Sequence, residues 1–166
     1  MIARWGWLAL LLAAGAAYAW VVAGVGPALI AAGRGLQPFD LRIGGYSRAD
    51  AAAYLLRIGP EGRAWYLDRV IPADLVFAGL FAAALGAVAL RLGGGVAVAV
   101  LAALPGLCDL AETLTIARML AQEPAALDPG LVARASVLTQ AKWAALVLAA
   151  LVLARQARLS RGGGRG

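Results

Sequence analysis

Histidine is absent from the 166 residues of this chain, and Cys108 is the single cysteine. Without histidine there is no imidazole to ligate zinc or haem, or to act as a general base near neutral pH. One cysteine cannot close an internal disulfide, and it cannot supply the thiolates that an iron–sulfur cluster needs. We therefore predict no metal site and no cofactor.

Charge is also scarce, since only 14% of the residues are charged while 63% are hydrophobic, above the roughly half of soluble proteins. The net charge of +6 lies in loops and at the C-terminus without a nucleic-acid-binding motif, so we predict no nucleic-acid partner. Four long stretches contain almost no charge. Runs of 18 or more apolar residues are typical of membrane-spanning helices.

These stretches predict an all-α polytopic membrane protein, with spans over residues 7–32, 72–90, 96–116 and 135–154. Gly93, Gly94 and Gly95 form so short a connection that the neighbouring helices must be antiparallel. The prediction is a single domain over residues 1–154, an antiparallel four-helix transmembrane bundle, followed by a flexible basic tail over 155–166. The first stretch has an alternative interpretation as a cleavable signal peptide, because Arg4 precedes its apolar part over 5–16 and the triplet Ala17, Tyr18, Ala19 that follows resembles a cleavage site.

Arginine distribution predicts the orientation. The tail contains Arg155, Arg158, Arg161 and Arg165 without any acidic residue, whereas the loop over 34–71 mixes arginines with aspartates and glutamate. We expect both termini in the cytoplasm of a bacterial inner membrane and the large loop outside. Anionic lipid headgroups are the expected partners of the tail, and a membrane-protein partner or a second copy of the chain remains open.

The large loop contains a predicted amphipathic lid. Ser47 is a good helix N-cap with Asp50 three residues later, and Gly59 with Pro60 ends the segment. A second helical piece follows over 61–70. The apolar side chains at helical spacing, together with one tryptophan, are expected to lie against lipid or against the bundle: Tyr54, Leu55, Ile58 and Trp65.

Several strings are familiar: FDLRIGGYS over 39–47, LLRIGPEGRAWYL over 55–67, DLAET over 109–113, and the isolated Asp74 and Lys142. Together they resemble an uncharacterised family of small bacterial four-helix inner-membrane proteins, over residues 39–143. In that family an asparagine usually follows the acidic pair, where this chain has Thr113. The resemblance implies an architecture and a set of residues, and it brings no activity with it.

The few ionisable residues inside the spans form the candidate site. Asp109 and Glu112 share a helix face at i, i+3, and by helix rise they lie roughly 13 and 9 Å below the interface, while Lys142 lies roughly 12 Å below it. An unpaired charge in lipid costs about 3 kcal/mol, so the three are expected to meet inside the bundle. The predicted polar cluster is completed by Thr113, Thr139, Gln140 and Asp74, with Ser136 nearby.

Two acids against one lysine leave an excess negative charge, so either one acid is protonated or another cation completes the site. The leading expectation is a non-enzymatic accessory or assembly component, whose cluster organises the bundle. The alternative is a small carrier or binding protein for a proton, an amphiphile or a lipid. A lipid-acting enzyme ranks third among the interpretations. The spans offer it no activated nucleophile and no third carboxylate except Asp74 at their rim.

Overall fold

The computed structural model describes residues 2–162, and that part of the chain is helical without any strand. The longer helices are α1 (Ile2–Ala19), α2 (Gly26–Gly33), α3 (Arg48–Trp65), α4 (Ile71–Arg91), α5 (Val96–Leu120) and α6 (Pro129–Gly162). Shorter π-helical and 3₁₀ segments join them: η1 (Trp20–Val25), η2 (Phe39–Leu41), η3 (Tyr66–Val70) and η4 (Pro124–Ala126). The predicted all-α four-helix architecture is confirmed.

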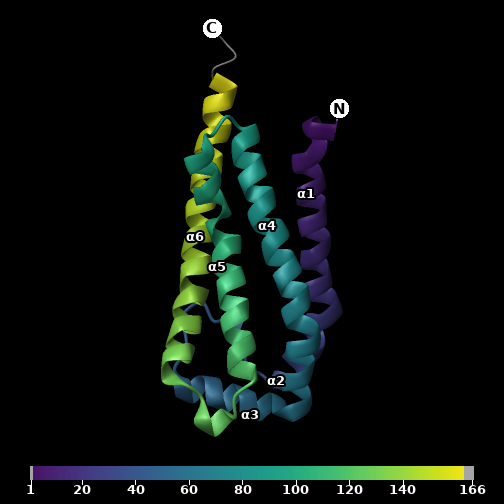
Figure 1. Ribbon diagram of the computed structural model, residues 1–166, viewed down its shortest axis with the longest axis vertical. Helices are drawn as coiled ribbons and strands as arrows, with labels where there is room; N and C mark the ends of the chain where they lie inside the picture. Colours follow the sequence, from purple (N-terminus) through teal and green to yellow (C-terminus); the bar gives the residue numbers. More distant parts are fainter. Residues whose placement is uncertain (1, 163–166) are drawn as a thin grey trace.

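The four long helices α1, α4, α5 and α6 run along the long axis of the molecule (Figure 1). Helix α1 packs on α4, α4 on α5, and α5 on α6, whereas α1 and α6 make almost no contact with each other. Both ends of the described chain lie at one end of the molecule, and α3 crosses the opposite end (Figure 1). The bundle is therefore a row of four helices whose first and last members leave one side open.

Four helical segments are long and apolar enough to cross a membrane: Trp5–Gly33, Arg48–Arg91, Val96–Leu120 and Pro129–Arg161. Their outer surfaces expose large apolar side chains such as Trp5, Leu12, Val100 and Leu151, as expected of helices that contact lipid. Length and composition together indicate a multi-pass membrane protein.

The first span continues through Pro27 into α2, although proline inside a helix removes a backbone donor and crowds the preceding turn. The adjustment occurs just before the proline, in η1, where the Gly26 amide donates to the Val21 carbonyl five residues back. This π-helical turn widens the backbone ahead of the proline, so the helix is not broken.

The last helix is longer than the sequence predicted. α6 does not end near residue 154 but continues to Gly162, because Arg155, Gln156, Ala157 and Arg158 are good helix formers. The separate tail predicted over 155–166 is therefore helical as far as residue 162, and residues 163–166 lie outside the described chain.

The lid helix α3 begins at a capping box. The Ser47 amide donates to Asp50 Oδ2 at 2.9 Å, and the Asp50 amide donates to Ser47 Oγ at 3.2 Å. Gly59, with φ of +67° and ψ of −177°, is not helical, so α3 consists of two helical pieces that meet at a kink before Pro60, as the sequence predicted. The second piece then continues through η3 directly into α4.

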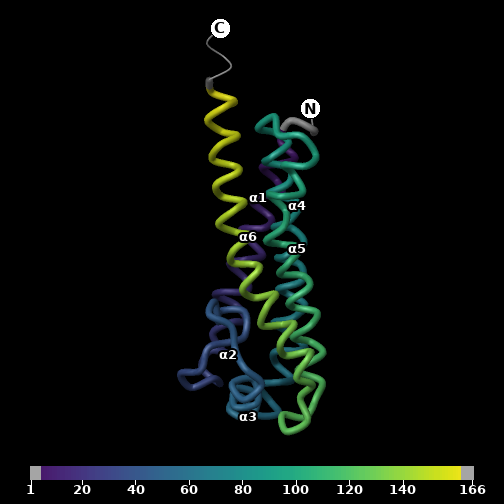
Figure 2. The backbone as a smooth tube through the Cα atoms, turned by 90° about the vertical axis from the view of Figure 1, so that its left-hand side faces the viewer, coloured from purple at the N-terminus to yellow at the C-terminus, as the bar shows by residue number. Residues whose placement is uncertain are grey.

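Helix α3 crosses one end of the bundle (Figure 2), and its apolar side chains are buried in the core. Tyr54, Leu55 and Ile58 are buried in one core cluster with Phe39 and Met119. Trp65 differs from them: it is 38% exposed, and its indole Nε1 donates to the Val25 carbonyl of η1 at 3.1 Å. Lid and bundle thus share a single apolar core.

Candidate functional site

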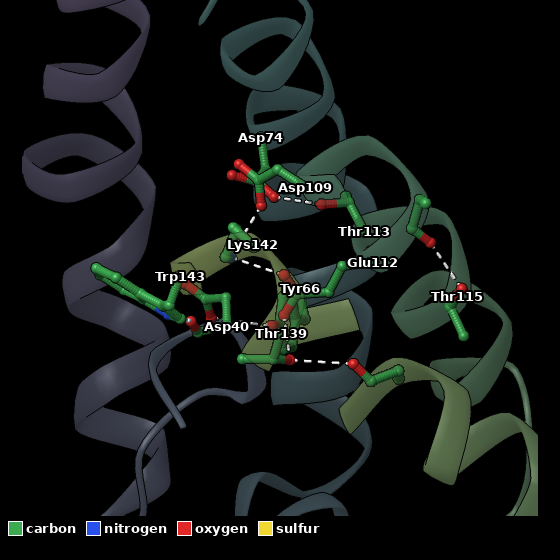
Figure 3. Close-up of polar contacts among 12 residues, drawn as sticks. Asp40, Tyr66, Asp74, Asp109, Glu112, Thr113, Thr115, Thr139, Lys142 and Trp143 are labelled. Carbon is green, nitrogen blue, oxygen red and sulfur yellow. Dashed lines mark hydrogen bonds and ion pairs between the residues drawn. The ribbon is translucent and has the colours of Figure 1, made fainter. Parts of the chain in front are cut away.

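An ion pair joins helices α5 and α6 inside the bundle (Figure 3). Lys142 Nζ of α6 lies 2.9 Å from Asp109 Oδ1 and 2.7 Å from Glu112 Oε2 of α5. Glu112 is fully buried and Asp109 is 4% exposed, so both carboxylates depend on this lysine for compensation. The i, i+3 spacing of the two acids places both on the face of α5 that meets α6.

A hydroxyl group of α6 contacts the second carboxylate oxygen of Glu112. The Thr139 hydroxyl, one turn before Lys142 on α6, donates to Glu112 Oε1 at 2.6 Å. It also lies 3.1 Å from the Ala135 carbonyl, and the shorter contact takes the larger share of its single proton. Both Glu112 oxygens are thus engaged, which fixes the register of α6 on α5.

Asp74 brings α4 into the cluster. Its Oδ2 accepts a hydrogen bond from the Thr113 hydroxyl of α5, and its carboxyl group lies beside that of Asp109 (Figure 3). Thr113 therefore engages a carboxylate in this chain. The residues of three helices, α4, α5 and α6, meet at one level of the bundle.

Gln140 does not join the cluster, contrary to the sequence-based prediction. Its side chain is exposed and lies next to Gly45, in the loop that precedes α3. Consecutive residues of a helix point about 100° apart, so Gln140 faces away from the direction of Thr139. Ser136 also faces this loop, and its Oγ accepts from the Tyr46 amide at 2.8 Å. Both side chains hold the loop against α6.

Asp40 is a part of the site that the sequence did not predict. It lies in η2, where its carbonyl accepts from Trp143 Nε1 at 3.3 Å and its Oδ1 accepts from the Tyr66 hydroxyl at 3.5 Å. Burial raises the pKa of this carboxyl, and the positive charge of Lys142 opposes that rise. Nothing in the local pattern of the loop signals a contact with residues about a hundred positions later.

The cluster forms one end of a groove of about 530 Å³. The polar side chains at that end are Asp40, Asp74, Asp109 and Lys142. The remaining wall is apolar and comes mainly from α1, η1, α4 and α6: Leu11, Ala14, Gly15, Tyr18, Val21, Val22, Leu41, Phe77, Phe81, Pro105, Trp143 and Leu146.

The groove is open along the side where α1 and α6 fail to pack together. Gly15 and Tyr18 line it and are nevertheless exposed, Tyr18 by 55%. Tyr18 contacts Phe77 of α4, with ring centroids 5.4 Å apart, so the α1–α4 interface forms one wall. Trp143 projects from α6 beside Asp40 (Figure 3).

The polar contacts at this site are ion pairs and hydrogen bonds. The hydroxyls of Thr113 and Thr139 donate to the carboxylates of Asp74 and Glu112. Within residues 2–162 no three histidine, cysteine, aspartate or glutamate side chains are grouped so as to hold a metal ion. Comparison with protein-family models, with curated proteins and with solved structures found no match to this chain.

Proposed function

We propose that this protein binds an amphiphile within the membrane, holding the head group at the Asp/Lys cluster and the apolar chain along the groove. The observation that carries the proposal is that the cluster is not sealed inside the bundle. It forms the polar end of an otherwise apolar groove of about 530 Å³. Such a volume is within the range of small-molecule sites, which combine an apolar wall with a few convergent polar groups.

The open side between α1 and α6 supports entry from the bilayer. An amphiphile that passes sideways between these helices keeps its chain among Tyr18, Phe81 and Leu146 throughout. Only its head group must leave the interface, and Asp40, Asp74 and Asp109 lie where that head group arrives. The apolar chain does not have to pass through water, so the free-energy cost of exposing it to water is avoided.

The rival hypothesis is an assembly component, in which the cluster only organises the helices. It explains part of the site. Glu112, Thr139 and Lys142 form a closed network that needs no ligand. Asp40 and Asp74 are different, because they place further carboxylates beside the groove without a second lysine. Ionisable groups at membrane depth are costly and usually serve a function, so we favour a binding role, without catalysis.

We further propose a bacterial inner membrane location with both termini in the cytoplasm. Arg155, Arg158 and Arg161 lie at the same end of the bundle as Arg91, where anionic lipids are their expected partners (Figure 1). The lid α3 and the cluster are then nearer the outer face. A reporter that works only in the cytoplasm should be active at the C-terminus, and an inactive one would reverse this orientation.

The binding role is tested with a variant that keeps Trp143 and replaces Trp5, Trp7, Trp20 and Trp65 with phenylalanine. In phosphatidylcholine nanodiscs, single-chain amphiphiles brominated on the chain should quench Trp143 fluorescence in a saturable way, because Trp143 lines the groove. The same amphiphiles without bromine should reverse the quenching. The set of probes includes cationic, neutral and anionic head groups.

A pair of glycine variants separates groove binding from contact with bulk lipid. A Cβ atom at Gly15 meets nothing within 4 Å, so Gly15→Leu should place its side chain in the groove without displacing packed atoms. Gly6 of the same helix is equally unobstructed and does not line the groove. Saturable quenching should be lost in Gly15→Leu and kept in Gly6→Leu. Equal quenching in both, or none with any probe, would refute the binding role.

A further inference from the structure

We propose that the head group bound in this groove is a protonated amine that donates N–H hydrogen bonds to Asp40, Asp74 and Asp109. The inference rests on the proposed function, since it names the chemistry of the amphiphile that the groove would hold. It is carried by the charge balance and by the unused acceptors at the polar end of the groove.

The positive charge of Lys142 is already compensated. Its ammonium group lies within 2.9 Å of both Asp109 and Glu112, which together carry one more negative charge than the lysine can balance. Lys142 is the one cationic side chain among the described residues that line the groove. An anionic head group would therefore meet a surplus of carboxylates rather than a free cation.

The Arg42 guanidinium packs against aromatic rings outside the groove, and its Nη2 is buried without a hydrogen-bond partner among the described residues. Arg42 lies over the rings of Phe39, Tyr46 and Tyr54, at 5.1 to 5.7 Å from their centroids, and its Nε donates to the Gln37 carbonyl. Arg42 is not among the residues that line the groove. The residues that line the groove therefore include three acidic side chains and one basic side chain.

Carboxylate oxygens remain available as hydrogen-bond acceptors in the groove. One oxygen of Asp109 accepts from Lys142, one of Asp74 from Thr113, and one of Asp40 from Tyr66. The second oxygens of Asp74 and Asp109 accept no hydrogen bond from any described side chain or amide, whereas the Asp40 carboxyl also accepts from its own backbone amide. The three side chains come from three elements, α5, α4 and η2, and all of them line the groove, so together they offer acceptors to a primary ammonium group, which has three N–H donors.

The apolar wall argues for an organic amine over a bare cation. A metal ion would need several ligands in one shell, and no such group occurs in the described part of the chain. An alkylammonium group needs only hydrogen-bond acceptors around the nitrogen and an apolar surface along its chain. Leu11, Phe81 and Leu146 provide that surface, and the low dielectric around them strengthens the charge-assisted bonds.

The test uses the Trp143 quenching assay with one brominated dodecyl chain and four head groups: primary ammonium, trimethylammonium, hydroxyl and sulfate. The primary ammonium should half-saturate quenching at a concentration about tenfold below each of the others. Trimethylammonium has the same charge and no N–H donor, so it separates hydrogen bonding from charge alone. Equal or tighter binding of any of these three heads would overturn the inference.

Matched aspartate variants locate the preference. Asp74→Asn and Asp40→Asn should each reduce the preference for the primary ammonium several-fold, while the asparagine Oδ1 can still accept from Thr113 or Tyr66. Asp68→Asn, an exposed residue that does not line this groove, should leave the preference unchanged. An unaltered preference in both groove variants would contradict the inference, even if one of them binds less overall.

The failure of this inference is distinguishable from the failure of the proposed function. Quenching that disappears in Gly15→Leu, but shows no preference for the amine, would keep the groove as a binding site and reject the amine. Competition then identifies the source of a bound amine: unbrominated dodecylamine represents single-chain amines, and phosphatidylethanolamine added to the nanodisc represents lipid head groups. Displacement by neither of them would also reject the amine.

Discussion

Lys142 is a cation buried between two helices, and both of its carboxylate partners depend on it. Lys142→Met should leave an uncompensated charge on Glu112 or Asp109 and lower the free energy of unfolding by about 3–5 kcal/mol at pH 8. Adding Glu112→Gln should recover much of this loss, because the neutral side chain no longer buries a lone charge. The measurement is thermal stability in detergent for the four variants of the cycle.

The interaction energy from that cycle should exceed about 0.5 kcal/mol. Thr139 also donates to Glu112, and within the described residues it forms no hydrogen bond with Lys142. Strict additivity of Lys142→Met with both Glu112→Gln and Asp109→Asn would mean that the three side chains do not interact.

Asp40 should make stability depend on pH. Burial raises the pKa of its carboxyl, so the folded state holds this proton more tightly than the unfolded state. Well below pH 4 both states are protonated, and Asp40 has no effect. As the pH rises, the unfolded state ionises first, which lowers stability until the folded carboxyl also ionises. Asp40→Asn should therefore raise the melting temperature at pH 8 and change it much less at pH 4.

Asp68→Asn is the control for this pH dependence, because Asp68 is exposed and loses the same charge. A stabilisation by Asp40→Asn that is as large at pH 4 as at pH 8 would show that the carboxylate charge is not its cause.

The packing of α4 on α5 depends on a close approach at Gly106. A Cβ atom there would lie 2.6 Å from the Ala78 carbonyl oxygen and 2.8 Å from the Ala82 Cβ, so the two backbones can meet only because this position has no side chain. Gly106→Ala should force the helices apart and cost about 1–3 kcal/mol, measured as thermal unfolding.

Gly79→Ala is the matched control on α4, since a Cβ atom there meets nothing within 4 Å. It should be neutral or slightly stabilising, because alanine favours helix more than glycine does. If both variants melted at the same temperature, the close helix contact would be contradicted. The displacement of α5 should also move Asp109, so Gly106→Ala is expected to weaken quenching by the amine probe.

At this scale the sequence predicted the helices well and their packing poorly. The spans were predictable, because long apolar runs of this length are typical of membrane-spanning helices. Helix α4, for example, lies within one residue of its predicted bounds. The meeting of Asp109, Glu112 and Lys142 was predictable, because an unpaired charge in lipid is costly and all three have similar depths. Asp40 was missed and Gln140 was wrongly included, because loop paths and helix rotation depend on three-dimensional contacts that no local pattern records.

The open side of the molecule was also invisible in the sequence. All four long helices are apolar on most of their surface, so nothing in their composition says that α1 packs on α4 and leaves α6 uncovered. The aromatic contact between Tyr18 and Phe77 holds α1 at that position. Whole-molecule shape, rather than any single motif, thus creates the groove next to the cluster.

The binding of an amphiphile in this groove is the central claim, and native mass spectrometry tests it most directly. The protein purified in mild detergent should carry a co-purified amphiphile at about one copy per chain, and Gly15→Leu should lose it while Gly6→Leu retains it. The lost species should carry an amine. A bound complement identical in all three proteins, or a stoichiometric protein partner retained by every variant with no amphiphile, would contradict the claim.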